Sequence, residues 1–194
     1  MLKNQVHPAA IRSKNLISNS LLTLMKDNPY ERISVTDITE HALLTRRTFY
    51  AHFKSKEDVL EYQLNTLNSE LLTITESADK THRAMAYAYF HFWMDHVDYL
   101  KLMKQHKLLT LVFENFENQI KEMRSLFECK LAENDPIYAD YSSAYFTGVL
   151  SNILSRWIEK GAQESPETLV EIIYTITNSL SSHFSDLDKL DSNS

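Results

Sequence analysis

Apolar residues recur at helical spacing along most of the chain. Between residues 8 and 26, one face of a helix would carry Ile11, Ile17, Leu21, Leu24 and Met25. We expect this helix to end near Asn28, because a residue that precedes proline disfavours the helical conformation. Only two glycines and four prolines occur in the 194 residues, too few for the tight turns of a multi-stranded sheet. The pattern therefore predicts an all-α protein.

Three helix starts follow one another closely after this first helix. Ser34 and Asp37 have the spacing of a capping box and predict a helix from Val35 to about Ala42. Thr45 is suited to cap a third helix over residues 46–53. The segment Ser55–Asp58 repeats the capping pattern and opens a fourth helix. The spacing predicts short helices in quick succession.

The remainder of the chain predicts longer helices, to a total of about nine. Polar residues 77–81 mark a break that forms a domain boundary unless a long fourth helix bridges it. Further helices are expected over the ranges 84–94, 108–131, 136–157 and 166–184, with a short one after Asp98. We assign residues 1–60 to an N-terminal three-helix domain and residues 61–194 to a C-terminal helical-bundle domain.

Charge is distributed unevenly between these two parts. The net charge of the chain is −6, but residues 1–60 carry nine Lys/Arg against six Asp/Glu, whereas residues 61–194 carry eleven against twenty. A basic segment attached to an acidic body indicates that only the first part meets a polyanion. The same imbalance can also arise by chance.

Other compositional features bear on the cellular compartment. The single cysteine, Cys129, excludes an internal disulfide framework and favours a reducing environment. The longest apolar run, residues 84–90, is too short to span a membrane, and residues 1–10 lack the pattern of a signal peptide. We expect a cytoplasmic protein with no membrane partner and no cofactor.

The segments 35–42 and 46–53 have the composition of a helix-turn-helix. Its apolar set would be Ile38, Ala42, Leu44, Phe49 and Phe53. Side chains that can donate hydrogen bonds to base edges and phosphates would point outward from the second helix. The candidate DNA-binding residues are Thr36, Thr45, Arg46, Arg47, Thr48, Tyr50, His52, Lys54 and Lys56. The alternative is that Arg46 and Arg47 form the solvated face of a packing helix.

Residues 33–60, ISVTDITEHALLTRRTFYAHFKSKEDVL, resemble the DNA-binding domain of the TetR/AcrR repressors. The resemblance implies that the positions of Tyr50, His52 and Lys56 hold DNA phosphates, and that residues 45–48 touch bases. Leu43 departs from the pattern, because the turn usually has glycine there at positive φ. A leucine would be strained by about 1 kcal/mol or more in that conformation.

The C-terminal part carries a second resemblance. Residues 157–161 followed by Ser165-Pro-Glu are similar to the C-terminal domain of a subgroup common in Firmicutes. In the wider family the last two helices pair with their copies in a four-helix bundle, so a homodimer on a double-stranded DNA operator is expected. Matching apolar stripes are Tyr145, Val149, Ile153, Trp157, Leu169, Ile173, Ile176 and Leu180. Ordinary intrachain core is the alternative for each of them.

An aromatic-rich segment in the middle of the chain is a candidate effector site. Its residues are Tyr87, Phe90, His91, Trp93, Met94 and Tyr99. They could line a cavity for a small hydrophobic or aromatic effector, or they could simply form core. Control by a protein partner, or no effector at all, is the other alternative.

The sequence offers little for an enzyme. His91 and Asp95 lie four residues apart and could hold a metal with His82 or His106, but a second clustered pair is missing. We find no glycine-rich phosphate loop or nucleophile elbow. A purely structural helical adaptor would leave the outward arginines unexplained. The expected function is that of a repressor released from a palindromic operator by a small-molecule effector. Residues 1–60 would be its helix-turn-helix DNA-binding domain, and residues 61–194 would bind the effector and dimerise.

Overall fold

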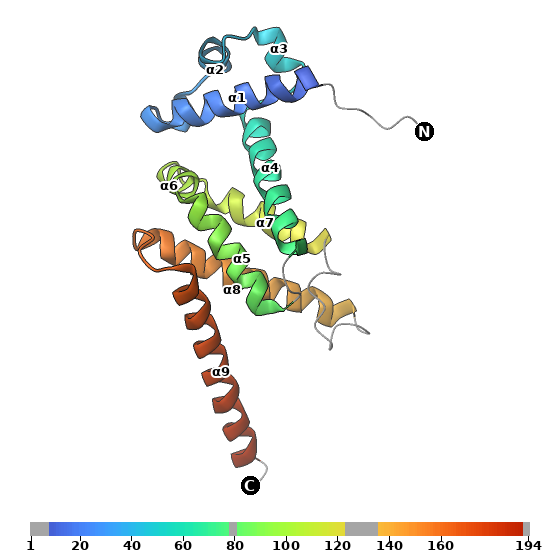
Figure 1. The fold of residues 1–194 in the computed structure, drawn as a ribbon, viewed down its shortest axis with the longest axis vertical. Coiled ribbons are helices and arrows are strands. Elements are labelled where there is room, and N and C mark those ends of the chain that lie inside the picture. Colours follow the sequence, from blue (N-terminus) through green and yellow to red (C-terminus); the bar gives the residue numbers. More distant parts are fainter. Residues whose placement is uncertain (1–7, 78–80, 123–135, 192–194) are drawn as a thin grey trace. The chain divides into compact units, whose positions relative to one another are not determined.

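The computed structural model describes residues 8–77, 81–122 and 136–191. Within these ranges the chain forms nine α-helices and one 3-10 helix, which confirms the all-α prediction (Figure 1). The elements are α1 (Pro8–Asp27), η1 (Tyr30–Arg32), α2 (Val35–His41), α3 (Arg46–Tyr50), α4 (Lys56–Ser77), α5 (His82–Asp95), α6 (Val97–Gln105), α7 (Leu109–Glu122), α8 (Pro136–Glu159) and α9 (Pro166–Asp191). No described helix is long and apolar enough to cross a membrane.

The chain divides into two compact units. The first comprises the residues up to Glu70 together with Leu102–Asn115, and the second comprises Leu71–Lys101 and the residues from Phe116 onward. Helices α4, α6 and α7 each contribute residues to both units. This partition follows packing, whereas the division of function near residue 60 stays a prediction.

The core of the first unit is built from the predicted apolar positions. Helix α1 packs against α2, and α2 packs against α3 (Figure 1). Ile17 and Leu21 of α1, Ile38 of α2 and Phe49 of α3 have no exposed surface. Complete burial of such a side chain contributes roughly 1.5–3 kcal/mol. The helix-turn-helix therefore has a fully enclosed apolar centre.

Side-chain caps start these short helices as the sequence predicts. The Ser34 hydroxyl accepts from the amide of Asp37 at 3.2 Å, and the Asp37 carboxylate accepts from the amide of Ser34 at 2.8 Å. Thr45 caps α3 by accepting from the amide of Thr48 at 3.1 Å. Each such cap is worth about 0.5–2 kcal/mol. Local chemistry thus determines where α2 and α3 begin.

Helix α3 is shorter than predicted, since it ends at Tyr50 rather than at Phe53. The amide of His52 bonds to the carbonyl of Phe49 at 2.9 Å, which tightens the last turn. The next free amide, that of Lys54, is taken by the Asp58 carboxylate at 2.8 Å. The start of α4 therefore competes with continuation of α3.

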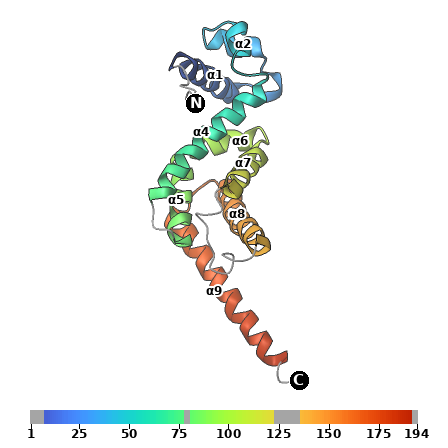
Figure 2. The same ribbon diagram turned by 90° about the vertical axis from the view of Figure 1, so that its right-hand side faces the viewer.

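The second unit is organised around aromatic side chains. Helix α5 packs beside the first turns of α9, and the rest of α9 extends beyond α5 and α8 (Figure 2). Phe90 and Trp93 of α5 are buried, as are Leu150 and Leu154 of α8. The prediction that residues 84–94 form an enclosed helix is confirmed.

The ends of the last helices differ in part from the prediction. Gly161, at φ 94°, follows α8 as expected, and Ser165 accepts from the amide of Thr168 at 3.3 Å at the start of α9. Helix α9 continues to Asp191 instead of ending near residue 184, because its tail contains no glycine or proline to stop it. Helix α7 is described as far as Glu122. Its predicted continuation to residue 131, which includes Cys129, lies outside the described residues.

Candidate nucleic-acid interface

Helix α3 separates a buried side from an exposed side. Phe49 is completely buried, whereas Arg46, Arg47 and Tyr50 are exposed. The Arg46 guanidinium lies 6.0 Å from the centroid of the Tyr50 ring, a distance that permits a cation–π contact. A short helix of this kind, with cations and a phenol facing outward, has the size and donors to enter a major groove.

The residues flanking α3 differ in how they are held. Thr36 and Thr45 are exposed, and the hydroxyls of Thr45 and Thr48 lie 2.9 Å apart at the helix start. His52 is half-buried, with its ring centroid 6.5 Å from that of Phe53. These contacts limit the rotamers of three polar side chains before any DNA is present.

The two lysines after α3 have different surroundings. The Lys54 side chain is exposed, and its backbone amide binds Asp58. Lys56 is half-buried, and its ammonium donates to the carbonyls of Tyr30 and Ile33 at 2.6 and 3.1 Å. Proximity in sequence therefore does not give these two cations the same environment.

The turn between α2 and α3 keeps the backbone that the resemblance implies. Leu43 has φ 53°, and its side chain is 92% exposed. The amide of Leu44 closes the turn on the carbonyl of Thr39 at 2.9 Å. The turn therefore accepts a leucine in the left-handed region, although this side chain adds nothing to the core.

Ionisable groups at the base of the helix-turn-helix are shifted by their neighbours. Burial of Tyr30 and its hydrogen bond to Glu57 at 2.8 Å raise the pKa of that phenol above its ordinary range. Burial opposes ionisation of Glu57, but hydrogen bonds to its own amide and to Tyr30 outweigh this and lower its pKa. Both groups stay in one protonation state near neutral pH.

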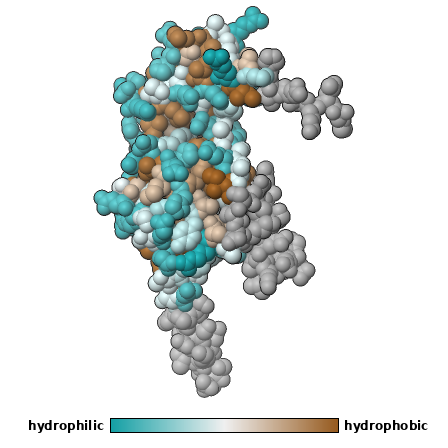
Figure 3. Space-filling view, in the orientation of Figure 1, coloured by the Kyte–Doolittle hydropathy of each residue, from teal (hydrophilic) through white to brown (hydrophobic). Residues whose placement is uncertain are grey.

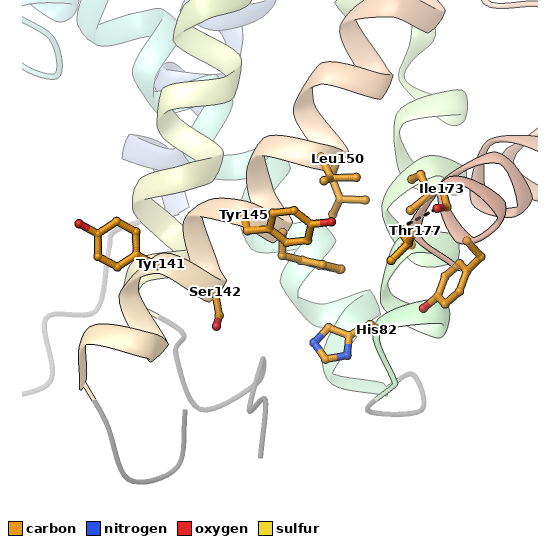
Figure 4. A pocket seen from close by; sticks show the side chains of 11 residues that line it. His82, Tyr141, Ser142, Tyr145, Leu150, Ile173 and Thr177 are labelled. Carbon is orange, nitrogen blue, oxygen red and sulfur yellow. Dashed lines mark hydrogen bonds between the residues drawn. The ribbon is translucent and has the colours of Figure 1, made fainter. Parts of the chain in front are cut away.

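A cavity of about 500 Å³ lies in the second unit, between α5, α8 and α9 (Figure 4). Its lining is mostly apolar. The residues are His82, Ala86, Tyr141, Ser142, Tyr145, Phe146, Val149, Leu150, Ile173, Tyr174 and Thr177. In the close view Tyr145 points toward the space between the helices, whereas the ring of Tyr141 points away.

None of the six residues expected at an effector site lines this cavity. Phe90 and Trp93 belong to the buried core, while Met94 and Tyr99 are half-buried. The guanidinium carbon of Arg83 lies 5.9 Å from the centroid of the Tyr87 ring. His91 is exposed and pairs with Glu167 at 2.8 Å. Ligand binding by these six residues stays a prediction, and the cavity is a separate candidate.

The cavity residues could have been suspected from α8 alone. Tyr141, Tyr145 and Val149 recur at intervals of four, which places them on one helix face. What the spacing does not reveal is that His82 and Thr177, from distant parts of the chain, close the same space. Tyr145, Val149 and Ile173 also belong to the stripes expected to pair two copies.

The expected pairing stripes are only partly on the surface. Trp157 and Leu169 are 2% and 4% exposed, which is the environment of intrachain core. Tyr145 and Ile176 are 63% and 51% exposed. The half-buried members are Val149, Ile153 and Ile173, and the side chain of Leu180 lies outside the described residues.

The residues weighed for a metal site do not form one in the described ranges, where no group of three metal-ligating side chains comes together. His106 instead uses both ring nitrogens: Nδ1 accepts from the amide of Tyr30 at 3.3 Å, and Nε2 donates to the carbonyl of Met25 at 2.8 Å. This arrangement gives the histidine a role in holding the first unit together.

Comparison with known families agrees with this arrangement. Residues 20–62 match the family described as bacterial regulatory proteins, tetR family, and residues 80–179 match a family described as transcriptional regulator C-terminal region. The chain belongs to the TetR family. Members of this family are DNA-binding transcriptional regulators rather than enzymes.

Individual relatives are more distant. The dhaKLM operon transcriptional activator DhaS of Lactococcus lactis is 33% identical over 63 residues, which cover 32% of this chain and 34% of DhaS. The uncharacterised regulator YxbF of Bacillus subtilis is 21% identical over 170 residues, 84% of this chain and 44% of YxbF. The matches thus span less than half the length of either relative. Both relatives are from Firmicutes.

Solved structures share the fold. A transcriptional regulator of the TetR/AcrR type from Aquifex aeolicus superposes with a TM-score of 0.57 at 21% identity. The superposition covers 87% of this chain and 99% of that protein. At this level of identity the likeness concerns the arrangement of helices alone.

Proposed function

We propose that this TetR-family regulator binds a palindromic operator as a homodimer and represses transcription until a small hydrophobic or aromatic effector releases it. The observation that carries the DNA-binding part is the exposed side of α3, where Arg46, Arg47 and Tyr50 project from a helix anchored by buried Phe49. We assign base contacts to residues 45–48. Contacts to phosphates are assigned to Thr36, Tyr50, His52 and Lys54.

Dimerisation follows from the limited size of one module. A single five-residue α3 makes few base contacts, whereas two copies one helical turn apart on DNA multiply the affinity. Exposed apolar side chains on α8 and α9, among them Tyr145, Ile172 and Ile176, supply a surface that a second copy would cover. Pairing would hold the two α3 helices at a defined separation.

Binding to the region upstream of its own gene tests the proposal. We expect a gel shift at nanomolar dimer that weakens steeply with salt, because phosphate contacts release counterions. The double variant R46E/R47E should abolish the shift. A matched control, K101E/K160E, changes the charge equally at two exposed lysines of the second unit and should shift DNA almost as the parent does. Equal loss in both variants would argue for a nonspecific charge effect.

The direction of regulation has a second candidate. DhaS, which is similar over 63 residues, is named a transcriptional activator. Activation would require the bound regulator to recruit or position the polymerase rather than block it. A reporter fused to the upstream region, measured with and without the gene, separates the two. Higher reporter output on deletion supports repression, and lower output supports activation.

The cavity between α5, α8 and α9 is a second candidate effector site, in addition to the aromatic segment expected from sequence. A ligand can induce release only if it binds better to a dimer whose α3 helices are wrongly spaced for DNA. Hydrophobic aromatic probes should therefore weaken the gel shift. The variants A86W and F90A test the cavity and the aromatic segment separately. A protein partner would instead leave all such probes without effect.

A further inference from the structure

Lys56 begins α4 and reaches back to the 3-10 helix η1. Its ammonium donates to the carbonyl of Tyr30 at 2.6 Å and to that of Ile33 at 3.1 Å, and it lies 3.4 Å from the carbonyl of Glu31. The same nitrogen sits 4.2 Å from the centroid of the Tyr30 ring. An ammonium has three donor hydrogens, so these carbonyls can occupy all of them.

The carbonyls bound by Lys56 lie in η1 and at Ile33, the residue that follows it. The carbonyl of Tyr30 also accepts from the amide of Ile33 at 3.2 Å, so the ammonium is its second donor. Directly after them comes Ser34, which caps α2. Lys56 therefore connects the first turn of α4 to the segment that leads into the helix-turn-helix. Its positive charge also suits the negative end of a helix dipole.

Neighbouring contacts strengthen this connection. The Tyr30 hydroxyl donates to Glu57, the residue after Lys56, at 2.8 Å. The amide of Tyr30 donates to His106 at 3.3 Å. The hydroxyl, the amide and the carbonyl of Tyr30 thus each make a hydrogen bond, and Lys56 supplies the positive charge of the cluster.

We propose that Lys56 is a positioning residue, which sets the entry of α2 and hence the presentation of α3, and that it is not a phosphate contact. This inference rests on the proposed function, and it replaces the role that the family resemblance implies for Lys56. To reach a phosphate the ammonium would have to break its hydrogen bonds to the carbonyls of Tyr30 and Ile33. The side chain of Lys54 is exposed, so Lys54 remains the candidate for a phosphate contact.

The test compares K56M with K54M in the full chain. The affinity for duplex DNA of the upstream region is measured over a series of KCl concentrations, and the thermal midpoint is measured without DNA. For K54M we expect an unchanged midpoint and a salt dependence whose log–log slope falls by about 0.9 for each phosphate that the protein no longer neutralises. For K56M we expect a lower midpoint and about tenfold weaker binding at every salt concentration, with an unchanged slope.

A conservative variant keeps the test decisive if K56M fails to fold. K56Q retains two N–H donors but carries no charge, so a positioning role predicts a partly restored midpoint and the parental slope. A reduced slope in K56Q or K56M, together with a parental midpoint, would overturn the proposal. If the parent protein bound no DNA at all, the proposed function would fail. The midpoints of K56M and K54M would still decide the role of Lys56: equal midpoints would refute it.

Discussion

The two units hold themselves together by different means. The first adds polar contacts to backbone carbonyls, such as those of Lys56, to a core that is mostly aliphatic and includes Ile17, Leu21 and Ile38. The second relies on large aromatic residues, with Trp93 and Phe90 almost fully enclosed. In the space-filling view, hydrophobic patches interrupt a largely hydrophilic face (Figure 3). Short helices such as α2 and α3 depend on local caps, because they are too short to be stable in isolation.

The surfaces of the two units differ in the same way. The first presents Arg46 and Arg47 from a basic segment, and the second leaves Tyr145 and Ile176 exposed within an acidic one. Cations suit a polyanion, and exposed apolar side chains suit a second apolar surface. Under the proposed function, DNA contact and self-association are separated by chemistry as well as by position.

The largest effect is expected from the aromatic core of the second unit. Replacing Trp93 by alanine should lower the free energy of unfolding by about 3–5 kcal/mol, because a large buried side chain leaves a cavity. Urea denaturation followed by circular dichroism measures this. Y141A, which removes an exposed ring, is the control and should lower the free energy of unfolding by less than about 0.5 kcal/mol. Equal costs would show that the core does not depend on Trp93.

A smaller effect is expected from the exposed face of α9. I176E places a charge where we expect a second copy, so the dimer should dissociate at least about tenfold more readily. Sedimentation velocity over a concentration series measures the change. N178E adds the same charge at an exposed position on another face of α9 and should leave the assembly intact. Identical behaviour of the two variants would place the interface elsewhere.

The strained turn should respond more weakly and in the opposite direction. L43G should raise the free energy of unfolding by about 0.5–1 kcal/mol, because glycine relieves a positive φ and the exposed leucine loses no packing. L43N, which also tolerates this conformation, should give a similar gain. In the second unit, A162G tests the same effect at φ 58°. Destabilisation by L43G would mean that the leucine makes a favourable contact.

The smallest effect concerns the capping carboxylates, one in each unit. Hydrogen bonds from the hydroxyl and the amide of Ser34 lower the pKa of Asp37, so its stabilising contribution is present above the ordinary pKa and is lost as pH falls through the lowered value. D37N should therefore flatten the fall in thermal midpoint between pH 5 and about pH 3. E167Q should do the same in the second unit, where the pKa of Glu167 is also lowered, chiefly by its own amide. A parental pH profile in D37N would refute the capping role.

Local signals account for what could be predicted. The caps at Ser34 and Thr45 depend on residues within a few positions of one another. The positive φ at Leu43 was implied by the family resemblance. The prediction for the end of α3 was wrong by three residues, because the amide of Lys54 donates to Asp58 of the next helix. Even a short-range pattern fails where two neighbouring helices compete for one backbone group.

Long-range contacts account for the rest. Lys56 meets Tyr30 across 26 positions, and the cavity joins His82 of α5 to Thr177 of α9. The sequence by itself determined that the chain is helical, where its first helices begin and which short helix presents cations. Only the tertiary structure decided which lysine ammonium binds backbone carbonyls, which apolar residues are core and where a cavity opens. The physical reason is that capping and helical periodicity act within a few residues, whereas burial depends on segments that meet only after folding.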